Sequence, residues 1–235
     1  MRGQRKGHQQ DLHGPERDHS RGRDLARRLA VSPTGSGVTS NGSLPNGNGQ
    51  LGGFFRSLVS DPRSVGAVVP SGASLGRLMA RGCGAGARVV EVGAGTGALT
   101  RAILNTGVSE GDLCLVDSDE RFVEILRENF PGARTVHGDA LSLGEQLQDL
   151  TGQVDYIISG LPLLLFSEAR KRRLLTAAFA LLGECGAFHQ FTYGGICPVG
   201  RRTLDSLGLK ASRLGVAALN VPPAFVYRFQ HREPQ

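Results

Sequence analysis

Residues 89–97 combine an apolar segment with glycines at a spacing of two. They read Val89-Val90-Glu91-Val92-Gly93-Ala94-Gly95-Thr96-Gly97. Glycines at this spacing let backbone N–H groups approach a ligand closely, where a Cβ would clash. The turn opens a helix that we expect over residues 96–106, and a helix N-terminus favours polar or anionic ligand groups. A strand, a turn and a helix of this kind build the nucleotide-binding end of a doubly wound α/β sheet.

Two acidic residues stand at the ends of later apolar segments, Asp117 after the segment 113–116 and Asp139 within Val136-His137-Gly138-Asp139-Ala140. The glycines and Asp117 also satisfy the loose dinucleotide fingerprint, in which an acid binds a ribose. Three features favour a different nucleotide cofactor: the third glycine, Gly97, the acid Glu91 before the first glycine, and Asp139. A dehydrogenase would also need a substrate domain, for which little chain is left.

The composition fits one domain with an extension, because the chain has 235 residues and domains commonly take 100–200. No apolar run reaches the ~20 residues that span a bilayer, and no secretion signal is recognisable. The four cysteines show no CxxC and no metal spacing, which predicts reduced thiols in the cytoplasm and no bound metal. The net charge of +6 leaves nucleic acid and anionic membrane open as partners.

Residues 1–50 differ from the rest of the chain. They begin rich in Arg, His, Gln and Asp and continue with Gly, Ser, Asn and Pro. Few apolar residues are available to bury, so the segment is expected to be a disordered extension. It is expected to be a solvated tail, a segment added by a start codon placed too far upstream, or a basic arm that touches lipid or nucleic acid.

Order is expected to begin near Leu51, which makes residues 51–235 the folded domain. Phe54, Phe55, Leu58 and Val59 fall on one helical face. Asp61-Pro62 and Pro70-Ser71 are typical helix starts. We therefore expect amphipathic helices within residues 51–82.

The remaining chain alternates between strand and helix patterns. This predicts an α/β fold with a doubly wound, mainly parallel, seven-stranded sheet. The last two strands lack a helix between them and are predicted to form an antiparallel pair at one edge. The expected strands are 88–92, 113–117, 133–136, 154–159, 186–193, 212–218 and 224–230, and the expected helices are 96–106, 119–129, 141–150, 167–182 and 200–207.

These motifs resemble those of the class I S-adenosylmethionine (SAM) methyltransferases, whose first motif is (E/D)-x-G-x-G-x-G. Residues 91–97 match it at every fixed position. The resemblance implies a Rossmann-like fold, SAM as the cofactor, and glycines wrapped around its methionine end. It further implies that Asp117 binds the ribose hydroxyls and that Asp139 accepts from the adenine amino group, with Ala140 beside the ring. The implied cofactor-binding residues are Glu91, Gly93, Ala94, Gly95, Gly97, Asp117, Asp139 and Ala140.

The segment after the fourth expected strand is the candidate substrate loop, because ligands of such sheets bind at the carboxyl ends of the strands. Methyltransferases that act on the amino groups of bases have (N/D/S)-(P/L)-P-(Y/F) here. This chain has Gly160-Leu161-Pro162-Leu163, preceded by Ser159. The absence of a stacking aromatic ring argues against a flipped adenine. Residues 161–165 then form an apolar lip suited to acyl chains, or residues 163–166 are simply part of the core.

A narrower resemblance links residues 51–230 to the bacterial phospholipid N-methyltransferases, which methylate phosphatidylethanolamine. It rests on Phe54–Ser71, on Ser159–Leu164, on Gln190-Phe191-Thr192-Tyr193-Gly194 and on Asn220–Ala224. That group is related to the rRNA adenine dimethyltransferases, whose Asn-Leu-Pro-Tyr this chain lacks. The resemblance implies a lipid amine as the acceptor, with an RNA adenine or a small molecule as alternatives.

The same resemblance implies a peripheral protein on the cytoplasmic face of an anionic membrane. The apolar face of Phe54, Phe55 and Leu58 would enter the interface, or pack over the cofactor as a lid. Basic residues would attract anionic headgroups, among them Arg170-Lys171-Arg172-Arg173 and Arg201-Arg202. The sequence does not indicate an oligomeric state.

Methyl transfer to an amine needs a deprotonated nitrogen and alignment more than a strong base. An alkyl ammonium has a pKa of about 10.4, and burial lowers it by disfavouring the charge. We expect Ser159 and the Gly160 carbonyl to orient the amine, with Gly160, Leu161 and Pro162 lining the substrate. Tyr193 is the second candidate catalytic residue, and His189 is expected to be structural.

Overall fold

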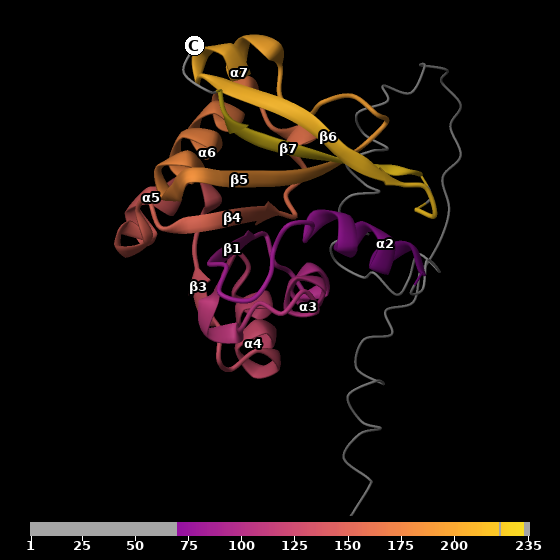
Figure 1. The fold of residues 1–235 in the computed structure, drawn as a ribbon. Coiled ribbons are helices and arrows are strands. Elements are labelled where there is room, and N and C mark those ends of the chain that lie inside the picture. Colours follow the sequence, from indigo (N-terminus) through magenta and orange to yellow (C-terminus); the bar gives the residue numbers. More distant parts are fainter. Residues whose placement is uncertain (1–69, 221, 233–235) are drawn as a thin grey trace, which may run out of the picture. The chain divides into compact units, whose positions relative to one another are not determined.

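The computed structural model describes residues 70–220 and 222–232. These residues form seven strands and the helices that connect them (Figure 1). The α-helices are α2 (Pro70–Met79), α3 (Ala98–Leu104), α4 (Glu120–Asn129), α5 (Leu143–Gln146), α6 (Glu168–Leu181) and α7 (Arg201–Ser206). The strands are β1 (Val89–Val92), β2 (Leu113–Asp117), β3 (Arg134–His137), β4 (Val154–Ser159), β5 (Leu182–Tyr193), β6 (Leu209–Ala217) and β7 (Ala224–His231). Short 3-10 helices include η3 (Ala140–Ser142) and η5 (Leu163–Leu165).

All seven strands lie in one sheet with the order β3-β2-β1-β4-β5-β7-β6. The pairs from β3 to β5 are parallel, and β7 runs antiparallel to both β5 and β6. The expected α/β fold and the antiparallel final pair are thereby confirmed. Strand order reverses between β1 and β4, which creates a crevice at the carboxyl edge where ligands bind in this class of sheet.

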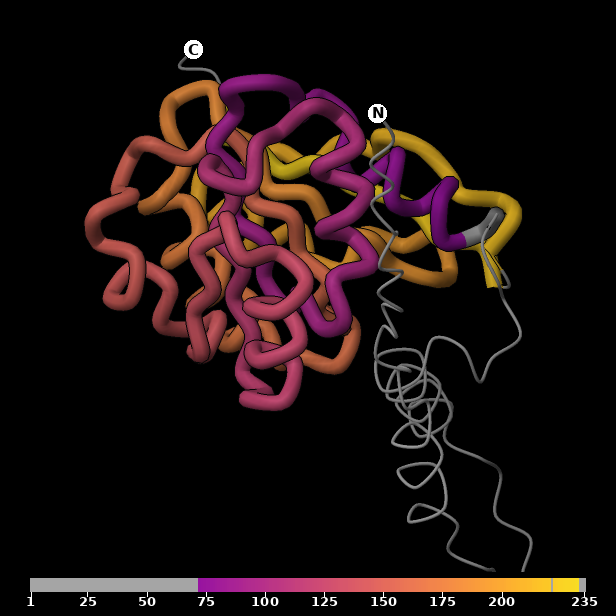
Figure 2. Tube along the Cα trace, turned by 90° about the horizontal axis from the view of Figure 1, so that it is seen from below, coloured from indigo at the N-terminus to yellow at the C-terminus, as the bar shows by residue number. Residues whose placement is uncertain are grey.

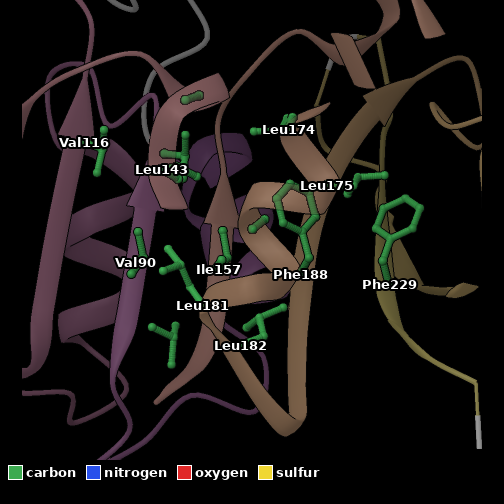
Figure 3. Packing of buried hydrophobic residues seen from close by; sticks show 14 of the residues in the cluster. Val90, Val116, Leu143, Ile157, Leu174, Leu175, Leu181, Leu182, Phe188 and Phe229 are labelled. Carbon is green, nitrogen blue, oxygen red and sulfur yellow. The ribbon is translucent and has the colours of Figure 1, made fainter. Parts of the chain in front are cut away.

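Alternating side chains divide the core between the two faces of the sheet. One face carries Val90, Ile157 and Phe188 and is covered by leucines of α5 and α6 (Figure 3), with Leu204 of α7 in the same cluster. The other face carries Val89, Leu115 and Ile158 and is covered by α2, α3 and α4. Both faces of β1 and β2 are therefore buried, as expected for strands that read as continuous apolar runs, whereas the edge strand β3 is partly exposed.

Helix starts follow the capping rules where the cap is a small polar residue. Asp119 accepts a hydrogen bond from the Arg121 backbone N–H at the start of α4, and Ser167 accepts one from Arg170 at the start of α6. Pro70 opens α2, as the Pro70-Ser71 pair predicted. These local signals explain why most expected helix boundaries agree with the structure within two residues.

Three expected elements differ from the structure, and one of them is β6, which begins at Leu209 rather than at 212. Residues 141–150 do not form one helix, because only Leu143–Gln146 is α-helical, between two 3-10 turns. β5 begins at Leu182 rather than at 186, directly after α6. Val154 pairs with Leu182 and Tyr156 with Ala187, so residues 183–186 form a bulge, and regular pairing begins at Ala187. The sequence pattern located only this regular part of the strand.

Helix α2 packs against the β6–β7 hairpin, and both views show the two side by side (Figures 1 and 2). A Cβ on Gly215 of β6 would lie 2.8 Å from the Leu78 side chain, and Arg81 Nη1 donates to the Leu214 carbonyl at 3.1 Å. The earliest described element is therefore fixed by the last two strands.

The expectations for residues 1–69 lie outside the described residues. They include the extension 1–50, the start of the domain at 51 and the apolar face of Phe54, Phe55 and Leu58. Among the helices that the structure describes, none is both long and apolar enough to cross a membrane.

His189 on β5 fastens α2 to the sheet. Its side chain is fully buried, and its Nδ1 lies 2.8 Å from the Met79 carbonyl. A carbonyl only accepts, so Nδ1 carries the proton and the neutral ring leaves Nε2 unprotonated. Burial lowers the pKa of His189 from 6.5 to about 4, against the opposing effect of the Met79 hydrogen bond. This agrees with the structural role expected for His189.

Because protonation of His189 favours the unfolded chain, we predict that the protein loses stability as the pH falls from about 6.5 to about 4. The full contribution is present above pH 6.5, and its loss amounts to about 3 kcal/mol at most. Urea unfolding followed by circular dichroism across this range measures it. His189→Asn keeps a donor for Met79 and removes the titration, so its stability should fall less over the same range. His137→Asn, at an exposed position, is the matched control and should behave like the wild type.

Candidate functional site

The glycine-rich loop joins β1 to α3 at the carboxyl edge of the sheet. Gly93, Gly95 and Gly97 all have positive φ, between 56° and 79°. A Cβ on Gly97 would lie 2.4 Å from the Phe130 ring, so packing explains that glycine. Gly95 differs, because the residue is buried and yet a Cβ would meet no protein atom within 4 Å. The structure therefore leaves space for a ligand at Gly95, whereas Ala94 packs into the core.

Asp117, the last residue of β2, holds the glycine loop in place. Its Oδ2 accepts from the Gly95 backbone N–H at 2.8 Å, and its Oδ1 accepts from the Asp119 N–H at 2.9 Å. The side chain is largely buried. A carboxylate offers about four lone-pair sites, so two remain for ligand hydroxyls. The predicted ribose-binding acid is thus positioned beside the space at Gly95.

Glu91 lies below this loop on the face that carries α3. Its side chain is fully buried, and Oε2 accepts from the Thr100 hydroxyl at 2.6 Å, while Oε1 has no partner among the described residues. Burial raises the pKa of Glu91 to about 8, the Thr100 bond opposes the shift, and the charge of Asp117 adds to it. A cationic group placed near Oε1 would favour the ionised carboxylate and satisfy the free oxygen.

The acid after β3 caps a 3-10 turn. Asp139 Oδ1 accepts from the Leu141 N–H at 3.0 Å, and the residue is exposed. Ala140 is buried in the core cluster under α5 and α6. Asp139 thus has accepting capacity toward solvent, while the Ala140 side chain packs inward.

The substrate loop after β4 lies directly against the glycine loop. The Gly160 N–H donates to the Val92 carbonyl at 2.9 Å, and a Cβ on Gly160 would stand 2.6 Å from the Gly93 carbonyl oxygen. A side chain at position 160 is therefore incompatible with this backbone. This explains the departure from the Asn, Asp or Ser of the base-modifying enzymes. Polar chemistry beside the loop has to come from neighbouring positions.

Ser159 and Tyr193, the two candidate catalytic residues, leave opposite faces of the sheet. Ser159 shares the face of Ile157, whereas Tyr193 packs in the cluster that contains Ile158. Burial raises the pKa of Tyr193, and the Asn220 side chain opposes the shift, so its hydroxyl is neutral at physiological pH. Ser159 is fully buried, and its Oγ accepts from the Leu161 N–H at 3.3 Å. The structure does not bring the expected pair together on one face.

Gln190 is the neighbour of Ser159 in register, and the sequence analysis had not assigned it to the site. Its Nε2 donates to the Leu161 carbonyl at 2.9 Å and to the Phe191 carbonyl at 2.8 Å. Both partners only accept, which fixes the orientation of the amide. Its Oε1 is buried and has no partner among the described residues. Two sequence signals were available for it: its place at the carboxyl end of β5 and its membership of the Gln190–Gly194 segment that resembles the phospholipid N-methyltransferases.

The leucines of the substrate loop divide between core and surface. Leu163, where a stacking ring would stand in base-modifying enzymes, is buried in the main core cluster. Leu164 and Leu165 are exposed, and Leu161 and Pro162 are half-buried. The expected apolar lip thus consists of Leu161, Leu164 and Leu165, because η5 turns Leu163 inward.

The site fits a ligand that carries hydroxyl and cationic groups. Gly95 provides space that a Cβ would fill, Asp117 has free acceptor capacity, and Glu91 Oε1 is a buried acceptor without a partner. SAM carries a ribose and an α-ammonium group. Asp117 would hold its ribose and Glu91 would face its ammonium group. No group of three or more His, Cys, Asp or Glu residues in the described segments is arranged to hold a metal ion.

Alanine substitutions at Gly95 and at Gly97 should have different effects. Gly97→Ala places a methyl group against Phe130 and should lower the thermal unfolding temperature strongly. Gly95→Ala meets no protein atom, so its stability cost should be confined to the left-handed backbone, roughly 1–2 kcal/mol. It should nevertheless weaken SAM binding at least about tenfold, because the methyl group enters the ligand space. Isothermal titration calorimetry on the folded Gly95→Ala protein tests this. Wild-type affinity would mean that the ligand lies elsewhere.

Comparisons with known proteins agree with this geometry. Residues 89–186 match the family model described as "Methyltransferase domain". The chain is 33% identical over 108 residues to the ornithine lipid N-methyltransferase of Singulisphaera acidiphila, covering 44% of this chain and 56% of that protein. It is 40% identical over 82 residues to ribosomal RNA small subunit methyltransferase A of Phenylobacterium zucineum, covering 34% of this chain and 27% of the relative. The chain therefore spans about half the length, or less, of these relatives.

The fold is also similar to that of a solved methyltransferase. The TehB-like SAM-dependent methyltransferase of Corynebacterium glutamicum superposes with a TM-score of 0.56 at 18% identity, covering 77% of this chain and all of that one. The glycine loop and the acid at the end of β2 lie inside the segment that matches the family model. Residues 89–186 thus match a methyltransferase domain, the described fold is that of a SAM-dependent methyltransferase, and the residues of the site fit SAM as the cofactor.

Proposed function

We propose that the protein transfers methyl groups from SAM to the primary amine of a membrane lipid headgroup, phosphatidylethanolamine above all. The observation that carries the proposal is the surface of the substrate loop, where Leu164 and Leu165 are exposed beside the crevice. The ornithine lipid N-methyltransferase supports it, since the lipid in that name also bears an amine. The resemblance to phospholipid N-methyltransferases in the sequence points the same way.

The loop chemistry suits an amine that needs alignment and no strong base. SAM supplies a methyl group on a sulfonium, which an amine lone pair displaces in line. The Gly160 backbone and the Gln190 amide offer carbonyl oxygens, and a neutral or charged amine donates to such acceptors. The Leu161 carbonyl already accepts from Gln190 Nε2 and from the Leu163 N–H. Apolar Leu161 and Pro162 disfavour the ammonium form, which releases its proton to water before transfer. Alignment of the two reactants can then supply several kcal/mol of the barrier.

An RNA adenine is the second candidate acceptor, favoured by the rRNA methyltransferase relatives and by the exposed arginines of α6. The site offers an adenine fewer favourable contacts than it offers a lipid amine. Leu163 is turned into the core, Gly160 cannot carry an amide or carboxylate, and the exposed side chains of the loop are aliphatic. Aromatic stacking is worth roughly 1–3 kcal/mol per base, and this loop supplies none from position 163.

The direct test is methyl transfer from radiolabelled SAM, with phosphatidylethanolamine vesicles, ornithine lipid vesicles and rRNA as parallel acceptors. We expect label in the phosphatidylethanolamine fraction, and chromatography of the product gives the number of methyl groups. Label found only in rRNA would show that RNA is the acceptor and would refute the proposal. Label in none of them, with SAM still bound, would indicate a small-molecule acceptor.

Gln190→Leu should lower kcat on the lipid acceptor, on the order of tenfold, because the Leu161 carbonyl loses one of its two donors and the loop loses its link to β5. SAM affinity should be unchanged, because Asp117 and not Gln190 holds the glycine loop. Steady-state kinetics together with calorimetry separate the two effects. Gln153→Leu, at an exposed position of the opposite edge, is the control. An unchanged kcat, or a parallel loss of SAM binding, would exclude a positioning role.

A further inference from the structure

The exposed large apolar side chains of the described segments gather at one edge of the sheet. Leu164 and Leu165 follow β4, Ile196 follows β5, and Val216 and Leu219 lie at the turn between β6 and β7. β5 is parallel to β4, and Ala217 and Ala224 of the hairpin pair beside Tyr193 at the end of β5. All five residues therefore lie at the carboxyl edge of the sheet, toward which β4 and β5 run in Figure 1.

Their exposure is large enough to require a reason. Ile196 is 75% exposed and Leu219 is 65% exposed, against 37% for Leu164 and 46% for Leu165. Single exposed apolar residues are normal on a protein surface. These side chains are concentrated around one opening, and none of the same kind is described at the opposite edge. This pattern indicates a surface that is removed from water by contact with a partner.

Five arginines flank this apolar rim. Arg170, Arg172 and Arg173 lie in the first half of α6, and Arg201 and Arg202 open α7. Glu168 joins the two helix starts, because its carboxylate accepts from the Thr203 hydroxyl at 2.6 Å. The Arg170 guanidinium stands 4.5 Å from the Phe166 ring centroid, which ties the basic cluster to the substrate loop. A shallow groove between η3 and α6 is lined by Arg172 and Arg173.

The charge of this cluster is not neutralised within the described segments. Glu168, the adjacent acid, is paired with the buried Lys171 at 2.7 Å. Some described arginines elsewhere do have carboxylate partners, as Arg121 has Asp119 and Arg134 has Asp149. None of the five rim arginines makes an ion pair with a described residue. The rim therefore presents uncompensated positive charge next to exposed aliphatic side chains.

We propose that the carboxyl edge is a membrane-docking face, in which Leu164, Leu165, Ile196 and Leu219 enter the interface of an anionic bilayer. The arginines of α6 and α7 lie against its phosphate groups. Interfacial binding combines apolar insertion with basic attraction, and this rim offers both. An RNA surface would use the charge and gain nothing from aliphatic side chains, since bases stack on aromatic ones. The inference rests on the proposed function and adds that the crevice opens directly onto the bilayer, so a headgroup amine reaches the site without leaving the membrane.

Vesicle sedimentation of the full-length protein tests the docking face, with vesicles of phosphatidylcholine and phosphatidylglycerol that contain no acceptor amine. Arg172→Glu/Arg202→Glu should lower the partition coefficient at least about twentyfold, since each basic residue near an anionic surface is worth roughly fivefold. Leu165→Asp/Ile196→Asp should lower it at constant arginine content. Arg88→Glu/Arg127→Glu makes the same charge change at exposed positions of the opposite edge and should bind like the wild type.

A second readout separates docking from chemistry. A short-chain phosphatidylethanolamine that is dissolved as monomers needs no membrane surface, so Arg172→Glu/Arg202→Glu should methylate it at the wild-type rate and lose activity only on vesicles. Unchanged vesicle binding by both rim variants would overturn the docking face, whatever the acceptor. Loss of rRNA binding in the arginine variant, without any vesicle binding by the wild type, would overturn it as well. Normal docking by a protein that methylates neither form of the lipid would support this face and refute the proposed function.

Discussion

The contact between Gly160 and Gly93 is the constraint on which the site depends. The two loops after β1 and β4 approach so closely that a Cβ at position 160 would lie 2.6 Å from the Gly93 carbonyl oxygen. The register of β1 with β4, in which Val92 pairs with Ser159, sets this approach. Cofactor loop and substrate loop are thus two sides of one crevice, at the point where strand order reverses. Any side chain at position 160 would separate them.

This constraint moves the polar chemistry of the substrate loop onto Ser159 and Gln190. Both are fully buried and share one face of the sheet, and both bond to the backbone of Leu161. On the opposite face, burial raises the pKa of Glu91 to about 8, so its carboxyl group is mostly uncharged at neutral pH. Asp117 on the same face holds the glycine loop. A buried acceptor without a partner costs free energy in the empty protein, and a ligand that satisfies it recovers that cost. Glu91 Oε1 and Gln190 Oε1 are two buried oxygens of this kind, on opposite faces of the sheet.

The sequence was sufficient for the fold and for placing the glycine loop and Asp117 at strand ends, because both depend on local patterns. Apolar runs ending in Gly93 and Asp117 placed two strands and their ligand-binding ends within a residue or two. It was insufficient where the outcome depends on tertiary packing. The bulge at residues 183–186 and the inward turn of Leu163 result from pairing and core filling that periodicity does not reveal. The sequence placed Ser159 and Tyr193 correctly at strand ends. Their side chains leave opposite faces of the sheet because of the strand register, which the sequence pattern does not reveal.

The surface contains the information about the acceptor that the core does not. The two core faces are closed by helices, so a leucine such as Leu163 has a packing reason and indicates nothing about the substrate. Leu164 and Leu165, one and two residues later, have no such reason, and Ile196 on the neighbouring loop is exposed further still. Two loops that are distant in sequence place aliphatic groups around the same opening, and two helix starts place arginines beside them. A soluble acceptor would need only the crevice. An acceptor held in a bilayer needs the crevice and also a rim of apolar and basic side chains that can contact the bilayer. The described residues provide both.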